Sequence, residues 1–316
     1  MISVYYRKEE KIIRESNLRQ LPQIDPLSVI WVDLNRLDDI EKRYITNKFG
    51  INLYEKQQQE EIESSSRYLE TSKMIVANSN FMIQHGDGYI NDPATFILKN
   101  NYLITHRTSE FRSFVEMTKK LMTYPKNFPT GYHVLLSIFE HRIDLDADIL
   151  EMIAKEISRV GKELSAEAKT RQEILIRIAQ FQELTMMLRQ NLVDKQRMIG
   201  AMLRSDHFPK DSYDRLRMMI KDVGSLMDHT NFSFDRLEYL QDTFLGLINI
   251  EQNKIIKIFT VASVIFLPPT LIASLYGMNF KYMPELKWYL GYPLAIFLMI
   301  FSSLITLWFF RRNRWL

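Results

Sequence analysis

Cysteine is absent from this chain of 316 residues, so disulfide frameworks and thiolate metal sites are excluded. No Gly-x-x-x-x-Gly-Lys-Ser/Thr pattern occurs, so no nucleotide is expected as a partner. Lysine and arginine are scattered and the formal net charge is only +3, so no nucleic acid is expected either. The first residues, MISVYYRKEEKIIRESN, contain no apolar core, so no cleaved secretory signal is expected. No nucleophile or acid–base set stands out, so the sequence does not predict an enzyme.

Charge is also missing from two long runs near the C-terminus. Residues 258–280 and residues 288–310 each contain 23 positions without a charged side chain. A helix that crosses the hydrocarbon core of a bilayer needs about 20 apolar residues, and both runs are long enough. We therefore expect residues 1 to about 255 to be water-soluble and the remainder to form a two-helix membrane hairpin in a lipid bilayer.

Cations flank these two spans on one side of the membrane. They are Lys254 and Lys257 before the first span, and Arg311, Arg312 and Arg314 after the second. Positively charged flanks stay in the cytoplasm, so both termini are predicted to be cytoplasmic and the short connection at 281–287 to face outward.

The soluble part divides into two regions by pattern. Residues 1–125 contain β-branched and aromatic runs at 29–34, 73–78, 81–84 and 94–107, with a hairpin or loop signal at 85–93. Helices are expected at 38–49 and 57–71, which makes this region an α/β domain. Residues 126–255 are expected to form long helices and a stalk, in which two helices span 131–206 with a break near 166–170. Residues 256–316 are expected to form the membrane hairpin with its basic tail.

A third long helix is predicted from residue 212 to 275, because no proline occurs before Pro268. Apolar or small residues recur along it at close to 3.5-residue spacing, which indicates packing against a partner or around an axis. The members are Leu216, Ile220, Val223, Met227, Thr230, Phe234, Leu237, Phe244 and Ile248. Such a helix would be about 95 Å long and would pass from the cytoplasm into the membrane.

A stripe of alternating small polar and bulky apolar residues follows on the first span. It consists of Asn253, Ile256, Phe259, Ser263, Leu267, Thr270 and Ser274, and it would continue the repeat of the stalk. Small polar residues mark close helix packing in membranes, or they line a water-filled channel with apolar constrictions at Ile256, Phe259 and Leu267. Spacing alone favours packing. Pro268 and Pro269 would either expose backbone carbonyls to a lumen or only bend the helix.

A single hairpin encloses no path for a polar solute, so it either anchors the protein or assembles with further copies. The second span is rich in leucine, isoleucine and phenylalanine all round, which suits contact with lipid. We therefore expect it to lie outside the first span.

The sequence between the spans resembles one known family. The segments are Tyr276-Gly277-Met278-Asn279, then Met283-Pro284-Glu285-Leu286, Trp288 and Gly291-Tyr292-Pro293. Together with the basic C-terminus at 311–316, they are similar to the CorA family of magnesium transport proteins, which carry a Gly-Met-Asn signature. The stretch 246–270 looks like the enterobacterial-type branch. The resemblance is strong over about the last 70 residues, and upstream only length and architecture agree.

The resemblance implies a funnel-shaped homopentamer in the bacterial inner membrane, with a central pore made by the first span. It implies that Gly277, Met278 and Asn279 form an outer mouth for hydrated Mg²⁺, and it favours the pore interpretation of the stripe. It also implies closure when cytoplasmic Mg²⁺ fills sites between subunits, whose residues the sequence leaves unknown. Co²⁺, Ni²⁺ or Zn²⁺ as the ion, or a membrane-anchored sensor or scaffold that transports nothing, remain alternatives.

Elementary chemistry is compatible with Mg²⁺ at such a mouth. Mg²⁺ dehydrates reluctantly, and a ring of neutral Asn279 amides can hydrogen-bond to its water shell without binding too tightly to release the ion. Inward movement of a doubly charged ion gains about 4.6 kcal/mol per 100 mV of potential. The Asp144-x-Asp146-x-Asp148 pattern is not a calcium loop, because Ile149 and Lys155 occupy the positions of the glycine and the final glutamate.

Overall fold

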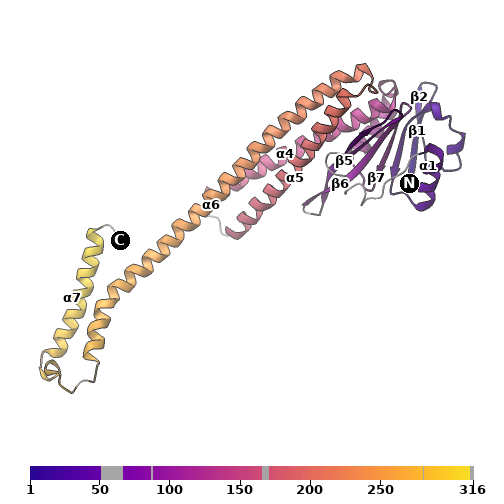
Figure 1. Cartoon of the computed structure of the whole chain (residues 1–316). Coiled ribbons are helices and arrows are strands. Elements are labelled where there is room, and N and C mark those ends of the chain that lie inside the picture. Colours follow the sequence, from indigo (N-terminus) through magenta and orange to yellow (C-terminus); the bar gives the residue numbers. More distant parts are fainter. Residues whose placement is uncertain (51–66, 87, 166–170, 280, 314–316) are drawn as a thin grey trace. The chain divides into compact units, whose positions relative to one another are not determined.

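The structure is a computed structural model that describes residues 1–50, 67–86, 88–165, 171–279 and 281–313 (Figure 1). The chain divides into two compact units, Met1–Leu240 and Gln241–Leu316. One helix, α6 (Tyr213–Tyr276), contributes residues to both units. The prediction of a single long third helix is confirmed.

A seven-stranded mixed sheet forms the first part of the N-terminal unit, in the order β2-β1-β3-β7-β6-β5-β4. Its strands are β1 (Ile2–Lys8), β2 (Lys11–Glu15), β3 (Val29–Asn35), β4 (Tyr68–Glu70), β5 (Met74–His85), β6 (Gly88–Lys99) and β7 (Tyr102–Arg107). Only the β3–β7 pairing is parallel among these described strands. The α/β prediction for this region is confirmed.

Two local predictions differ from the structure. The hairpin alternative predicted at 85–93 is confirmed by the antiparallel pairing of β5 with β6, but the chain turns just after His85, so most of this segment is strand and not loop. The expected helix at 57–71 falls largely outside the described residues, but Tyr68–Glu70 is a strand paired with β5. Pairing with β5 decided the conformation of Tyr68–Glu70. A local sequence pattern does not reveal such a long-range pairing.

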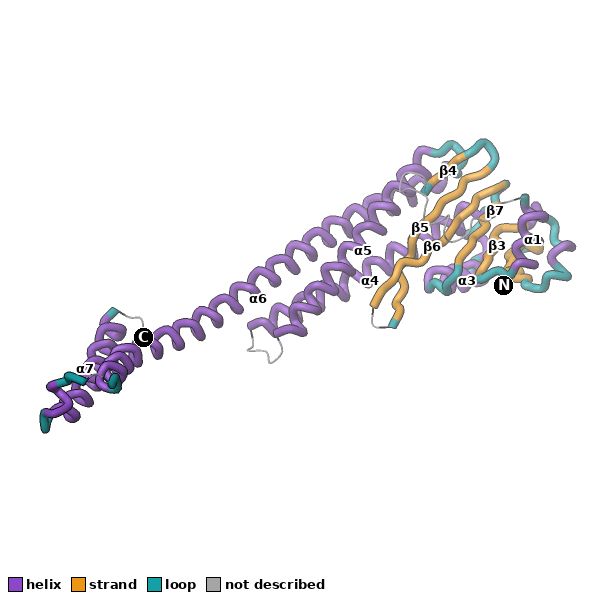
Figure 2. Tube along the Cα trace, turned by 60° about the horizontal axis from the view of Figure 1, so that its bottom comes forward, coloured by secondary structure: helices purple, strands orange, loops and turns teal. Residues whose placement is uncertain are grey.

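Helices cover both faces of the sheet (Figure 2). On one face lies α1 (Asp39–Phe49), which starts at an Asp38–Glu41 capping box and ends at Gly50 with a left-handed φ of 60°. Its Ile45 packs into an aliphatic core with strand residues such as Val32 and Ile104. The strands alternate, so their other side chains form the second face.

The second face carries an aromatic cluster under α3 (Arg112–Thr123) and the start of α4 (Gly131–Ser165). Trp31 and Phe81 from the sheet contact Phe114 of α3, and Phe139 of α4 lies tilted against Phe96. Gly131 makes this docking possible. A Cβ there would lie 2.2 Å from the Leu103 nitrogen, so only glycine fits where α4 crosses β7.

Helices α4, α5 (Arg171–Arg204) and the first part of α6 run side by side (Figures 1 and 2). The two predicted long helices across 131–206 are therefore confirmed, and residues 166–170 of the expected break lie outside the described residues. From Leu216 to Phe244 of α6 every seventh residue is buried, with all five exposures at 3% or less. These are Leu216, Val223, Thr230, Leu237 and Phe244. The four members up to Leu237 lie in the N-terminal unit, where α6 contacts α4 through the Arg215–Glu140 ion pair and α5 through the Arg189–Asn231 hydrogen bond.

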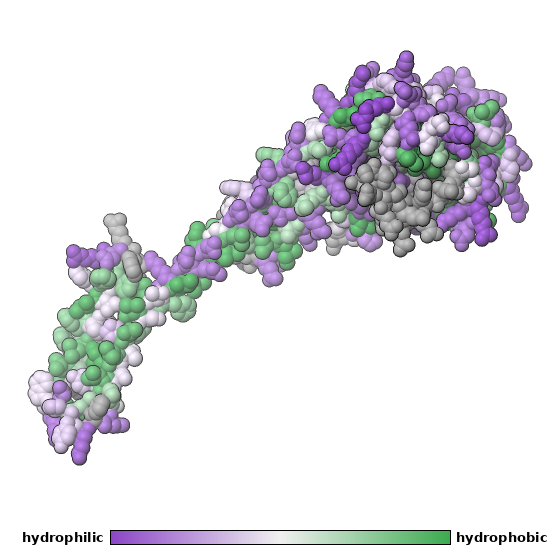
Figure 3. Space-filling view, viewed as in Figure 1, coloured by the Kyte–Doolittle hydropathy of each residue, from purple (hydrophilic) through white to green (hydrophobic). Residues whose placement is uncertain are grey.

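The C-terminal unit contains the end of α6, the short turn η6 (Pro284–Lys287) and α7 (Gly291–Arg312). Both helices are long and apolar enough to cross a membrane, and only 6% and 11% of their apolar windows are buried. Figure 3 shows this unit as a largely apolar surface. The two-span prediction is confirmed by these helices. The exposed apolar surface needs lipid or further protein to cover it.

Candidate ion-conduction site

The predicted stripe lies on one open face of α6 in the C-terminal unit. All seven of its residues are exposed. The bulkiest members, Ile256, Phe259 and Leu267, are 60%, 69% and 64% exposed. The small polar members Ser263 and Ser274 lie between and beyond them on the same helix face, three or four residues away. The chain itself therefore buries none of the stripe.

Helix α7 covers the opposite side of α6. Val261 is only 8% exposed, and Ile265, four residues on, accepts a long 3.5 Å hydrogen bond from the Ser303 hydroxyl of α7. Ile272 continues this face and is partly buried. Residues two positions apart on a helix, such as Val261 and Ser263, point in nearly opposite directions. The stripe therefore faces away from α7, as expected if α7 lies outside α6.

The stripe does not simply extend the buried repeat of the stalk. Counting in sevens from Phe244 reaches Ile265 and Ile272, which belong to the side covered by α7. An α-helix rotates by about 20° per heptad relative to an exact seven-residue repeat. Residues seven apart therefore move slowly from one face of a long helix to another. The apolar spacing alone did not predict this rotation of the buried face.

The two prolines inside α6 free specific backbone carbonyls. Proline has no amide hydrogen, so Pro268 and Pro269 leave the carbonyls of Val264 and Ile265 without their usual partners four residues on. The Ser303 hydroxyl donates to the Ile265 carbonyl and replaces one missing bond. Sequence reasoning did not single out Ser303, because only the packing of α7 brings it to this position.

The signature residues form the end of α6. The helix stops at Tyr276, and the amide of Gly277 still donates to the Ala273 carbonyl at 2.9 Å. A Cβ on Gly277 would lie 3.0 Å from the same carbonyl oxygen, so space rather than a left-handed φ favours glycine here. Met278 is 47% exposed. Asn279 is exposed, and within the described chain no hydrogen bond holds its amide.

A compact loop joins this turn to α7. The amide of Trp288 donates to the Glu285 carbonyl, and that of Gly291 donates to the Trp288 carbonyl. A Cβ on Gly291 would lie 2.2 Å from the Glu285 oxygen, so the loop closes onto the start of α7 only with glycine. Tyr289 and Tyr292 are 94% and 78% exposed, which places aromatic side chains where a membrane interface needs them.

The described acidic residues of the N-terminal unit do not gather into a metal site within one chain. Among the described residues, no three His, Cys, Asp or Glu side chains come together as metal ligands. Asp146, from the pattern that resembled a calcium loop, is fully buried and pairs with Arg142 and with the Lys195 ammonium at 3.0 Å. The four-residue spacing of Arg142 and Asp146 was visible in the sequence. Nothing local pointed to Lys195.

This buried triad is electrostatically constrained. Arg142 also donates to the Met82 carbonyl of β5 at 2.8 Å, so it ties α4 to the sheet. Burial lowers the pKa of Lys195, with Arg142 acting in the same direction and Asp146 opposing it. The three side chains thus pair with one another inside the fold.

Comparison with known proteins identifies the family of this chain. Residues 27–312 match the model of the CorA-like Mg²⁺ transporter protein. The chain is 39% identical over 321 residues to the magnesium transport protein CorA of Wolinella succinogenes and 32% identical over 320 residues to that of Escherichia coli, with 100% of both chains covered in each case.

A solved structure agrees with this assignment at the level of the fold. The complete structure of the CorA magnesium transporter from Methanocaldococcus jannaschii matches with a TM-score of 0.83 at 21% identity, covering 100% of this chain and 99% of that chain. The similarity thus extends over the whole chain and not only over the last 70 residues. The chain belongs to the family of CorA-like Mg²⁺ transporter proteins.

Proposed function

We propose that this protein is a channel-like importer of Mg²⁺ that assembles as a homopentamer in the bacterial inner membrane. The single observation that carries the proposal is the open stripe of α6, from Asn253 to Ser274, which α7 leaves uncovered. Several copies with these faces turned toward one axis would line a path with hydroxyl groups and apolar constrictions. The names of the full-length relatives support Mg²⁺ as the ion.

Asn279 is the residue that we expect to receive the ion. Its amide lies at the end of α6, is exposed and has no intramolecular hydrogen bond among the described residues, so it can bond to water. One amide from each copy would hold hydrated Mg²⁺ through the water shell, because stripping that shell is costly. Gly277 and Met278 shape the turn that presents it.

The direction of transport follows from charge. Lys254 and Lys257 precede the first span, and Arg311 and Arg312 end α7, so both chain ends would lie in the cytoplasm. The inside-negative potential then drives Mg²⁺ inward without a nucleotide. Feedback closure by cytoplasmic Mg²⁺ would require sites between copies, because one chain gathers no three ligands among its described residues.

Ion flux into liposomes tests the proposal. We expect Asn279→Ala to lower Mg²⁺ uptake by about tenfold or more, equivalent to about 1.4 kcal/mol of added barrier. Asn313→Ala is a matched control, since Asn313 is also exposed but lies at the other end of α7. Unchanged uptake in a correctly assembled Asn279→Ala variant would refute the role of this amide.

The same preparation separates the alternatives. Transport of Co²⁺, Ni²⁺ or Zn²⁺ without Mg²⁺ would overturn the assignment of the ion. If no divalent ion crosses, the protein is a membrane-anchored sensor or scaffold. The mass of the assembly in detergent tests the homopentamer independently of transport.

A further inference from the structure

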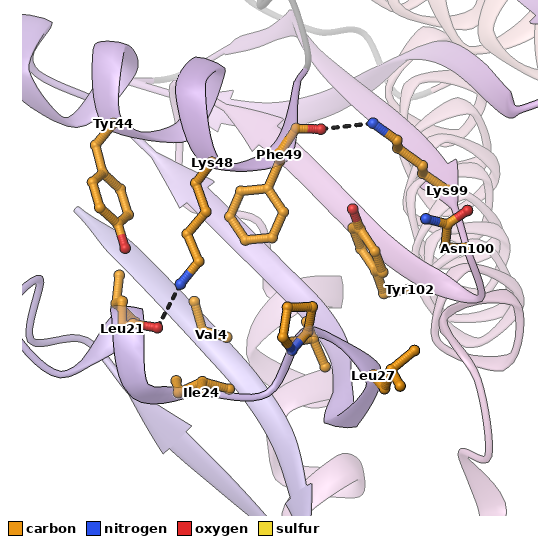
Figure 4. Close-up of a pocket in the computed structure, with 12 residues that line it drawn as sticks. Val4, Leu21, Ile24, Leu27, Tyr44, Lys48, Phe49, Lys99, Asn100 and Tyr102 are labelled. Carbon is orange, nitrogen blue, oxygen red and sulfur yellow. Dashed lines mark hydrogen bonds between the residues drawn. The ribbon is translucent and has the colours of Figure 1, made fainter.

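A cavity of about 270 Å³ lies in the N-terminal unit, between α1 and the short turns η1 (Leu21–Gln23) and η2 (Pro26–Ser28) (Figure 4). It is far along the chain from the membrane hairpin and has no part in the proposed conduction path. Its walls are mainly apolar. They include Val4, Leu21, Ile24, Val29, Phe49 and Tyr102.

Two lysines from different elements line this apolar cavity, on opposite sides of Phe49. Lys48 of α1 donates to the Leu21 carbonyl at 2.5 Å, and Lys99 at the end of β6 donates to the Phe49 carbonyl at 2.7 Å (Figure 4). No aspartate or glutamate is among the described residues that line the cavity. An ammonium group has three donors, so two donors on each lysine remain after these bonds. The cavity therefore carries positive charge that its own lining does not neutralise.

A third polar group has no partner. The hydroxyl of Tyr44, which also lines the cavity, is buried and forms no hydrogen bond among the described residues. A buried hydroxyl without a partner has lost its hydrogen bonds to water and gained none in return, which carries a free-energy cost. Such a cost suggests that the group is satisfied by something that enters the cavity.

A purely structural role explains part of this arrangement. Lys99 caps a free carbonyl at the C-terminus of α1, where a positive charge is favourable, and Lys48 ties α1 to η1. One hydrogen bond from each lysine is sufficient for that role. It does not account for the apolar cavity between them or for the orphaned Tyr44 hydroxyl.

We propose that this cavity binds a small organic monoanion, a carboxylate attached to a flat or short aliphatic apolar body. The carboxylate would accept a charge-assisted hydrogen bond from Lys48 and a further bond from Tyr44, whose ring lies beside the Lys48 ammonium. Lys99, on the other side of Phe49, would add positive charge without bonding to the same carboxylate. The body would lie against the aliphatic walls at Val4 and Ile24. A cavity of about 150 Å³ holds benzene, so about 270 Å³ suits a ligand of about ten heavy atoms.

Fluorine NMR of two probes with the full-length protein in detergent tests this site. 4-Fluorobenzoate carries the charge, and 4-fluorobenzamide has nearly the same shape without it. We expect saturable binding of the benzoate, tighter than that of the amide by about tenfold or more, because charged hydrogen bonds are roughly twice as strong as neutral ones. The double substitution Lys48→Met and Lys99→Met should abolish the preference while keeping the aliphatic stems. Lys73→Met, at an exposed lysine outside the cavity, should retain it.

A second variant tests the site independently, in case the double substitution prevents folding. Ile24→Trp fills the cavity and leaves both lysine bonds in place, so it should abolish binding of both probes. The proposal is overturned if neither probe binds saturably to the wild type, if acid and amide bind equally, or if the Ile24→Trp variant keeps the preference. Detergent micelles without protein supply the blank for nonspecific partition.

Discussion

The two units of this chain use similar apolar residues in opposite ways. In the N-terminal unit the residues of α4 such as Ile138 and Ile153 are completely buried by the sheet and the neighbouring helices. In the C-terminal unit Phe259 and Leu267 of α6 are more than 60% exposed. The first unit buries its apolar side chains within one chain, whereas those of the second stay exposed and need lipid or further protein to cover them.

Helix α6 contains this contrast within one element. Leu237 is fully buried against the chain, and Leu267, thirty residues later, is 64% exposed on the stripe. Residue type does not explain the difference, since both are leucines in a regular helix. The neighbours that the fold supplies explain it, and substitutions can measure how far the two regions differ.

The largest effect is expected at Gly131, in the self-sufficient unit. Gly131→Ala places a Cβ 2.2 Å from a backbone nitrogen of β7, where no side chain can yield. We expect the free energy of unfolding to fall by about 4 kcal/mol or more, measured by urea denaturation of residues 1–240. Gly200→Ala is the control, because a Cβ there meets nothing within 4 Å. A similar result for both variants would show that α4 does not dock on β7 as described.

The buried triad gives the next effect. Asp146→Asn removes the carboxylate that pairs with both Arg142 and Lys195, so it leaves buried positive charge uncompensated. Breaking a buried pair in this way costs about 3–5 kcal/mol. The same denaturation measurement checks it, and a loss below about 1 kcal/mol would mean that water reaches the triad.

The paired leucines compare the units directly. Leu237→Ala should destabilise the N-terminal unit by about 2–5 kcal/mol, because it leaves a cavity in a packed core. Leu267→Ala, made and denatured in the full-length protein because residues 1–240 lack this position, should leave that stability within about 0.5 kcal/mol and alter only Mg²⁺ flux. If Leu267→Ala instead unfolded the N-terminal unit, the two units would not be independent.

The smallest effect is a pH dependence at Lys195. Burial lowers the pKa of this ammonium in the folded state, so the unfolded chain binds more protons at any pH between the folded and unfolded pKa values. The free energy of unfolding of the wild type therefore rises with pH across that window. Within this window the free energy of unfolding rises by at most about 1.4 kcal/mol per pH unit.

The variant Lys195→Met lacks this rise. It should be as stable as the wild type or more stable near neutral pH, since a buried charge has been replaced by an apolar group of similar length. Its advantage should shrink as the pH is raised to about 10, below the titration of the buried tyrosines. A constant difference between the two proteins across this range would mean that Lys195 titrates normally.

The sequence by itself determined the membrane hairpin, the long α6 helix and the family. Two charge-free runs of 23 residues and the Gly277-Met278-Asn279 signature are local properties, and no folding is needed to read them. The spacing of three and four residues between members of the stripe also predicted that they share one face of α6.

Only the tertiary structure decided which residues meet across long sequence separations. The pairing of Lys195 with Asp146, the contact of Ser303 with Ile265, and the cavity between Lys48 and Lys99 each join elements far apart in the chain. Local patterns report the periodicity of one element, whereas the packing of several elements decides whether a side chain is buried, exposed or opposite a partner.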